Sequence, residues 1–197
     1  MTEYLKSHDT STNEGMDAAV EVAYALATKY GEGAAALSCE MYDAVAAIEG
    51  VSLPAAEPAA TATYEEAAQT VWGIMKHSDK PETVGSGVGR LVKMAGVDTT
   101  IQNGMRDGAQ FAWVPNGDTC AFCMMLASNG WRNISKKALK NGHAEHIHSN
   151  CDCTYAIRHD GKSNVAGYDP KKYRQIFDNA EGDTWDEKLA SVRHEQY

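Results

Sequence analysis

The chain has 197 residues, of which 43% are hydrophobic and 23% charged, and its formal net charge is −9. This composition is close to that of globular proteins and argues against a disordered chain, and no apolar run approaches the roughly 20 residues of a transmembrane helix. The N-terminal segment MTEYLKSHDTSTNEG also lacks the apolar region of a secretory signal. We therefore expect a protein that is made and used in a reducing cytoplasm, where five cysteines indicate metal or thiol chemistry before disulfides.

The negative charge lies in the first part of the chain. Residues 1–119 carry 17 Asp and Glu against 7 Lys and Arg, whereas residues 120–197 carry 10 against 11. An acidic balance opposes nonspecific nucleic-acid binding by the whole chain. The basic cluster Arg132, Lys136, Lys137 and Lys140 could contact phosphate locally, and its alternative interpretation is a solvated helix face.

Residues 1–49 are predicted to form an acidic, alanine-rich helical arm. Apolar residues recur at spacings of three and four, as one buried face requires. In the first run they are Met16, Val20, Ala23, Tyr24 and Ala27, and in the second they are Leu37, Met41, Val45 and Ile48. The step Gly31-Glu32-Gly33 is predicted to end or bend the helix between the two runs.

Residues 50–62, GVSLPAAEPAATA, combine two prolines with small residues and predict a linker. A helical segment follows over 63–107. Thr63 is its expected N-cap, and Val71, Ile74 and Met75 form its apolar face. The glycine-rich stretch VGSGVGRLVKMAG lacks the phosphate-loop pattern and predicts a loop that leads into a short helix over 90–95. A further helix is expected over 98–107, closed by Gly108.

In residues 108–160 the long helical patterns give way to short strand and turn patterns, and this segment is predicted to form a small module. QFAWV predicts a strand, Pro115-Asn116-Gly117 a turn, and CAFCMMLAS a knuckle that continues into a short helix ending at Asn129-Gly130. CDCTYAIRH alternates as a strand does. The tail, residues 161–197, is predicted to hold two helices, over 170–180 and 184–195. The expected fold class is α+β, with a mostly helical N-terminal part and a small zinc-stabilised module that contains short strands.

The zinc prediction rests on the clustering of thiols and imidazoles between Cys120 and Cys153. Cys120-x-x-Cys123 is the spacing with which one tight turn presents two thiolates to a tetrahedral ion. His148-x-x-Cys151-x-Cys153 supplies further ligands, and on a strand Cys151 and Cys153 would face the same way. Four ligands complete a structural zinc shell, so Cys151 and Cys153 remain alternatives for the last position.

The rival interpretation is a catalytic zinc, in a hydrolase or deaminase that uses Glu145. His143, Glu145 and His146 contain the H-x-E core of zinc deaminases, whose other half is a C-x-x-C pair. The order of the two halves is reversed here, however, and Thr119 stands where deaminases have proline. A closed shell of three cysteines and one histidine also leaves no open position for a substrate or water. We expect His143 and His146 to be solvated loop residues, and we expect no catalytic activity.

The segments RDGAQFAWVPNGDTCAFCMMLASNGW and HIHSNCDCTYAIRHDG resemble the minor head proteins of tailed bacteriophages, the family of the Mu F protein. That family has a C-x-x-C pair followed by a terminal H-x-x-C-x-C. The helical segment ALATKYGEGAAALSCEMYDAV also resembles minor capsid proteins of phages and prophages of Gram-positive bacteria. Carried over by position, the metal-type ligands are Cys120, Cys123, His148, Cys151 and Cys153. Two departures are Ser149, where the family usually has proline, and Asp152, where it often has a basic residue.

The resemblance implies a virion component in the head interior or at the portal vertex, present in the host cytoplasm during assembly. Its implied role is in head assembly and in genome packaging or delivery. The implied partner is the portal protein or the major capsid protein, with at most a weak contact to packaged DNA and none to a membrane. A third interpretation is a zinc-stabilised adaptor without a viral role.

Overall fold

The computed structural model describes residues 1–78, 80–116, 119–134 and 154–195. These residues form a mostly helical α+β fold with one small antiparallel sheet, which confirms the α+β part of the predicted fold class. The zinc stabilisation of the predicted module stays a prediction. In chain order the elements are α1 Thr2–Ser7, α2 Asn13–Glu49, α3 Tyr64–Met75, α4 Pro81–Asp107, β1 Gln110–Val114, α5 Ala121–Ala127, β2 Arg132–Asn133, β3 Thr154–Arg158, α7 Pro170–Asn179 and α8 Trp185–Glu195.

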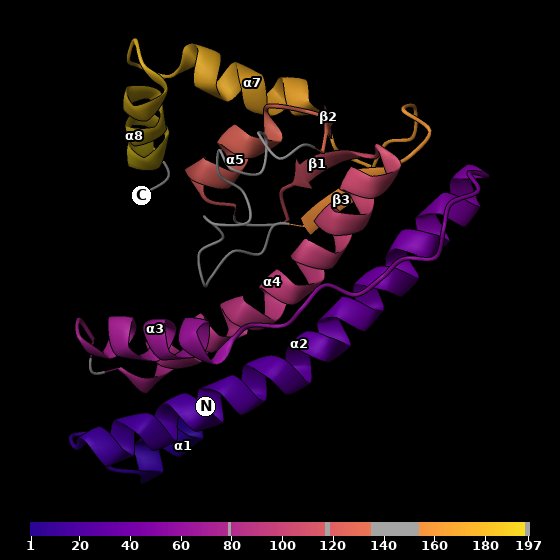
Figure 1. Ribbon diagram of the computed structural model, residues 1–197. Helices are drawn as coiled ribbons and strands as arrows, with labels where there is room; N and C mark the ends of the chain where they lie inside the picture. Colours follow the sequence, from indigo (N-terminus) through magenta and orange to yellow (C-terminus); the bar gives the residue numbers. More distant parts are fainter. Residues whose placement is uncertain (79, 117–118, 135–153, 196–197) are drawn as a thin grey trace.

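The two long helices, α2 and α4, lie side by side and run in the same direction (Figure 1). The helix α2 continues through Gly31 without a break, so the predicted end or bend at this position is wrong. Gly31 is buried, and a Cβ atom there would lie 3.1 Å from Cγ2 of Thr61 and 3.4 Å from Cβ of Ala95. The glycine therefore marks a close approach between α2 and its neighbours rather than a helix terminus.

The helix α4 is also longer than predicted. It begins at Pro81 and runs to Asp107, so the expected loop at the glycine-rich stretch is a helix. Gly87 and Gly96 are buried there, and a Cβ atom on Gly96 would lie 2.8 Å from Oγ of Ser38. Gly108 ends the helix with a φ of 69°, as predicted from its position. The Thr63 N-cap of α3 is confirmed as well, and Glu66 completes a capping box with it.

Residues 50–62 contain no helix or strand, but they are held in place between the two long helices. This segment, here termed the strap, returns along α2 and α4 towards α3 (Figure 1). The backbone N–H of Ala56 donates to Oδ1 of Asp43 on α2, at 2.9 Å, and the N–H of Ala59 donates to Oγ1 of Thr99 on α4, at 3.0 Å. The predicted linker is thus a structured connection, because both neighbouring helices satisfy its backbone polar groups.

The sheet has the order β2-β1-β3, and both pairings are antiparallel. The central strand β1 is the predicted QFAWV strand. Of the strand expected over CDCTYAIRH, β3 confirms the part Thr154–Arg158, and residues 151–153 lie outside the described part of the chain. Val114 pairs with Thr154 and Gln110 with Arg158. The two-residue β2 was not expected, because a pair of residues is too short to show an alternating pattern.

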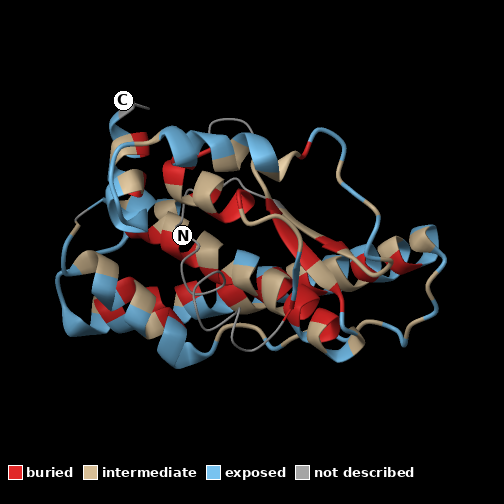
Figure 2. Ribbon diagram, turned by 90° about the horizontal axis from the view of Figure 1, so that it is seen from above, coloured by how far each residue is buried: buried red, intermediate tan, exposed pale blue. Residues whose placement is uncertain are grey.

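Two apolar clusters lie along the helix pair, and buried residues are concentrated where helices meet one another and the sheet (Figure 2). The first cluster joins α1, α2, α3 and α4 through residues such as Val20, Val71 and Val88. The second joins the C-terminal halves of α2 and α4 to the sheet and α5, with Tyr42, Ile101 and Phe111 among its members. The helix pair therefore belongs to both cores.

The C-terminal part packs on α5. One hydrogen bond joins it to α5, and another joins its two helices. Both predicted tail helices are present, as α7 and α8. Phe177 on α7 is fully buried, and it packs with Leu189, Val192 and Ala121. The hydroxyl of Tyr168 donates to the carbonyl of Ala127 at 2.8 Å, and Nζ of Lys188 donates to the carbonyl of Phe177 at 2.8 Å.

Candidate functional site

The Cys120–Cys123 pair lies at the beginning of α5. Cys120 is the N-cap residue, with an extended backbone, and its carbonyl accepts the N–H of Met124 at 3.1 Å. Cys120 is partly buried, and Cys123 is 3% exposed within the second cluster. The knuckle that runs into a short helix is therefore confirmed as local structure.

The strand register determines which parts of the chain enter this region. Residues 115–120 connect the end of β1 to α5, and Val114 at that end pairs with Thr154 at the start of β3. Thr154 follows Cys153 directly in the sequence. The start of β3 therefore lies next to the end of β1, the point from which the chain leads to Cys120.

The other predicted site residues lie outside the described part of the chain. They are the ligand candidates His148, Cys151 and Cys153, the residues of the catalytic alternative, His143, Glu145 and His146, and the basic residues Lys136, Lys137 and Lys140. Within the described ranges, no group of three or more His, Cys, Asp and Glu side chains is arranged to hold a metal ion. Arg132, the remaining member of the predicted basic cluster, is exposed in β2.

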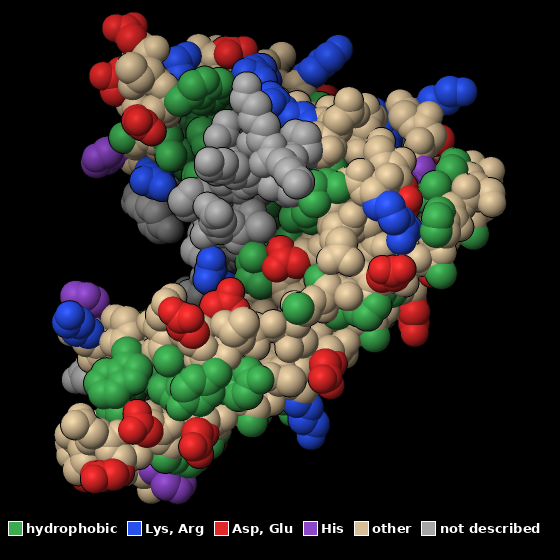
Figure 3. All heavy atoms as spheres, viewed as in Figure 1, with side chains coloured by type: hydrophobic (Ala, Val, Ile, Leu, Met, Phe, Trp, Pro, Cys, Tyr) green, Lys and Arg blue, Asp and Glu red, His purple; other side chains and the backbone are tan. Residues whose placement is uncertain are grey.

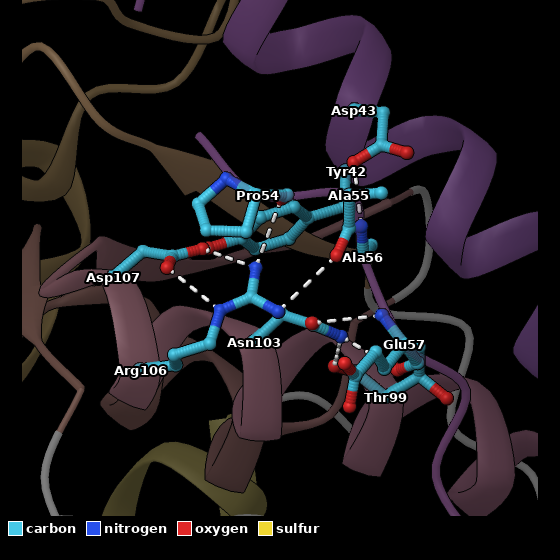
Figure 4. Close-up of polar contacts among 10 residues, drawn as sticks. All are labelled: Tyr42, Asp43, Pro54, Ala55, Ala56, Glu57, Thr99, Asn103, Arg106 and Asp107. Atoms are coloured by element: carbon cyan, nitrogen blue, oxygen red, sulfur yellow. Dashed lines mark hydrogen bonds and ion pairs between the residues drawn. The ribbon is translucent and has the colours of Figure 1, made fainter. Parts of the chain in front are cut away.

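A polar network fixes the strap to α4 beside the second cluster (Figure 4). Asn103 is 1% exposed, and its Oδ1 accepts the N–H of Glu57 at 2.9 Å while its Nδ2 donates to the carbonyl of the same residue at 2.8 Å. Arg106 donates to the carbonyls of Pro54 and Ala55 and pairs with Asp107. The strap therefore has fixed partners over much of its length.

Asp107 also binds α2, through a hydrogen bond of 2.8 Å from the hydroxyl of Tyr42. The Arg106 hydrogen bond lowers the pKa of the Asp107 carboxyl, and the Tyr42 hydrogen bond lowers this pKa further, against the opposing effect of burial. Burial and the neighbouring Asp107 raise the pKa of Tyr42, so its hydroxyl stays protonated as a donor. The ring of His159, which directly follows β3, packs edge-on against Tyr42 at 4.8 Å between centroids.

Two cavities open on the helical part. One, of about 540 Å³, lies between the strap, α3 and α4 and has Glu66, Arg90 and Asp98 in its wall. Burial raises the pKa of Asp98, and the charge of Glu66 adds to this effect. The other, of about 570 Å³, lies between the start of α2 and the end of α3 and is lined by Ser11, Trp72 and Lys76 among others. Neither brings together the nucleophile, base and oxyanion donors of a recognisable catalytic site.

The outer face of α2 was assigned incorrectly from the sequence. Leu37, Met41, Val45 and Ile48 were predicted to be buried, but Leu37, Met41 and Ile48 are exposed. Val45 is partly buried and packs against the second cluster. The buried positions of this half of the helix are instead Gly31, Ala35, Tyr42 and Ala46. In the first half the prediction was right for Met16, Val20, Ala23 and Ala27, whereas Tyr24 is exposed. The spacing of three and four was the correct signal of an apolar stripe, but it cannot tell which stretch of that stripe another element covers.

A model of the family described as VG15 protein matches residues 1–180. The chain belongs to the VG15 protein family. Membership in this family of viral gene proteins identifies a phage-related protein, the coarser part of the resemblance drawn from the sequence. No curated protein and no solved structure matches the chain. In the part of the chain that the structure describes, no helix is both long and apolar enough to cross a membrane.

Proposed function

We propose that this VG15 family member is a minor structural protein of the phage head, located in the head interior or at the portal vertex. Its role is in head assembly and in genome packaging or delivery, and it has no catalytic activity of its own. The observation that carries the proposal is the family match over residues 1–180, taken with the order of the two cysteine-containing motifs. The partner is the portal protein or the major capsid protein, and the acidic charge limits any DNA contact to a weak one.

The proposal includes one structural zinc ion, held by Cys120, Cys123, His148 and either Cys151 or Cys153. Two features of the described residues fit this group. Cys120 lies directly before α5 and Cys123 lies in its first turn, and β3 begins next to the end of β1, from which the chain leads to Cys120. When bound, such an ion supplies folding free energy rather than chemistry.

Metal analysis of purified protein tests the zinc site. Protein prepared without chelator should contain about one zinc per chain, and Cys120→Ala should remove most of it. Cys39→Ala is the matched control, since Cys39 lies on α2 and should not affect the metal content. Glu145→Gln should also retain the metal. A wild-type protein that is fully folded and free of metal would contradict the zinc assignment.

Fractionation of phage particles tests the head assignment separately. Tailless heads and free tails are isolated from infected cells, and the protein is quantified in each by mass spectrometry against the major capsid protein. We expect it in heads at a small fraction of the capsid copy number, and not in tails. Its presence in infected cells but absence from purified heads would contradict the proposal.

A further inference from the structure

The outer face of α2 carries a row of exposed apolar side chains. Tyr30, Leu37, Met41 and Ile48 are 57%, 67%, 40% and 84% exposed. Their spacings of seven, four and seven place them on one face of the helix, and we call this row the α2 stripe. In Figure 3 hydrophobic side chains recur along the outer edge of α2, with acidic side chains beside them.

The α2 stripe continues the row that the first half of the helix buries. Met16, Ala19 and Ala23 lie on the same face and are covered in the first cluster. Beyond Ala27 the strap and α4 lie against the neighbouring face, where the small residues Gly31 and Ala35 allow close packing. Within the described ranges, no segment covers the large side chains of the apolar row beyond Ala27, and Ala34 and Ala44 lie between these side chains. This alternation of large and small residues suits a second helix.

The charges along this half of α2 define the chemistry of the partner. Residues 30–49 contain four carboxylates and no Lys or Arg. Glu40 is exposed beside the stripe and Lys29 lies near its start, whereas Asp43 accepts the N–H of Ala56 in the strap and Glu49 accepts the N–H groups of His159 and Asp160. A second copy of this chain would bring a second Glu40 to the same surface. A partner with basic residues beside its apolar row would instead neutralise the exposed carboxylate.

We propose that the α2 stripe is the docking surface for an amphipathic helix of another protein, one whose apolar row is bordered by Lys and Arg. From Tyr30 to Ile48 the stripe spans about 27 Å, so the partner helix has about five turns. The inference deepens the proposed head function and rests on it for where the partner is found, in another head protein. The exposure of the α2 stripe follows from the packing within this chain and does not depend on the head function.

Binding of designed peptides to the full-length protein tests the surface. Two labelled helical peptides of about 20 residues share one Leu/Ala apolar row, and they carry either Lys or Glu at the flanking positions. Fluorescence anisotropy should show binding of the Lys peptide, at least about tenfold tighter than that of the Glu peptide. Raising the salt concentration from about 0.05 M to about 0.5 M should weaken the binding of the Lys peptide several-fold, because the flanking charges are exposed.

Variants of the stripe provide the specificity control. The double variant Leu37→Gln/Ile48→Gln should weaken binding at least about tenfold, whereas Ile176→Gln, which changes an exposed apolar residue on α7, should not. Glu40→Lys should reduce the preference for the Lys peptide. All of these side chains are exposed, so circular dichroism should show an unchanged fold.

Three outcomes would overturn the inference. The peptides could bind equally well, neither could bind, or the protein could sediment as a dimer that Leu37→Gln/Ile48→Gln dissociates, which would make a second copy the occupant. Because these measurements use only purified protein and peptides, they are independent of head fractionation. A protein that binds the Lys peptide but is absent from heads would contradict the head function and leave the docking surface intact.

Discussion

At the scale of single residues, Asn103 connects the strap to the helix pair. Its side-chain amide pairs with both backbone groups of Glu57, and its Nδ2 also donates to the carbonyl of Thr99 at 2.7 Å. No side chain of another type has both the donors and the acceptor that this arrangement uses, apart from the longer Gln. The residue is buried, so water cannot replace the lost contacts easily.

We therefore expect Asn103→Ala to lower the free energy of unfolding by about 2–4 kcal/mol, because the backbone groups of Glu57 lose their partners. Urea denaturation measures this loss, and hydrogen exchange at the Glu57 amide should accelerate more than at β1. The neighbouring exposed residue provides the control, since Gln102→Ala should change the stability by less than about 0.5 kcal/mol. Unchanged exchange at Glu57 in Asn103→Ala would show that the strap is held by other contacts.

Asp160 shows a second local effect, on proton binding. Its carboxylate accepts hydrogen bonds from the hydroxyl and N–H of Ser163 and from the N–H of Lys162, and these bonds lower its pKa to about 2. A lowered folded-state pKa contributes stability above the unfolded-state value of about 4, and this contribution is lost as the pH falls through about 2.

The corresponding measurement is a carboxyl ¹³C titration by NMR. We expect Asp160 to titrate near pH 2, and Ser163→Ala to raise this pKa because the largest stabilising hydrogen bond to the carboxylate is removed. Asp9, whose pKa is lowered by the hydrogen bond from the N–H of Ser11 in a different part of the chain, is the reference carboxylate and should be unaffected by Ser163→Ala. An Asp160 titration at the ordinary value would contradict the hydrogen-bonded loop.

At the scale of elements, the glycines of α4 have two different roles. A Cβ atom on Gly96 would lie 2.8 Å from Oγ of Ser38 and 3.3 Å from the carbonyl oxygen of Ala34, both on α2. A Cβ atom on Gly89, two turns earlier, would have nothing within 4 Å. Of these two glycines, Gly96 is thus the one required for the contact between the long helices.

Comparison of the two Gly→Ala variants separates packing from helix propensity. Gly89→Ala should stabilise the protein by about 0.5–1 kcal/mol, because alanine loses less backbone entropy in a helix. Gly96→Ala has the same propensity gain but crowds α2, so we expect it to be less stable than Gly89→Ala by about 2 kcal/mol. Thermal or urea unfolding of both variants measures the difference. Equal stabilities would show that α2 and α4 are not closely packed at Gly96.

The same glycines show what could be predicted from the sequence. Capping signals are local, so the beginning of α3 at Thr63 and the end of α4 at Gly108 were predicted correctly. Gly31 was predicted to end or bend a helix, and Gly96 was left between two predicted helices, because the sequence does not reveal that another element occupies the space of the missing side chain. The exposure of Leu37 and Ile48 was missed for the corresponding reason, as coverage of a helix face is a tertiary property.

For the candidate metal site, too, the sequence predicts the local structure but not the tertiary contacts. The Cys120–Cys123 pair lies before and within the first turn of a short helix, as the spacing and flanking residues indicated. That the start of β3 pairs with the end of β1, and so lies near the segment leading to Cys120, depends on strand register. No spacing rule in one sequence supplies this register. The zinc ion and its remaining ligands stay a prediction.

At the scale of the whole molecule, the helix pair couples the two apolar clusters. Val20 and Val88 contribute to the first cluster, and Tyr42 and Ile101 to the second, so each long helix extends through both. Glu49 at the end of α2 additionally accepts the N–H of His159 beyond β3, at 2.6 Å. Residues 1–49 and the sheet therefore share a core, and the second cluster loses one wall if α2 is absent.

We accordingly expect one cooperative unfolding transition, detected equally at both ends of the molecule. Trp72 on α3 reports on the first end, and Trp113 on β1, which is 4% exposed, reports on the second cluster. With fluorotryptophan incorporated, the folded-state ¹⁹F NMR signals of Trp72 and Trp113 should disappear at the same urea concentration. Val20→Ala removes two buried methyl groups, lowers the free energy of unfolding by about 2 kcal/mol and should shift both midpoints together. Leu37→Ala, on the exposed α2 stripe, should shift neither. A Trp113 midpoint that stays in place while that of Trp72 falls would instead show that residues 1–49 and the sheet unfold as separate units.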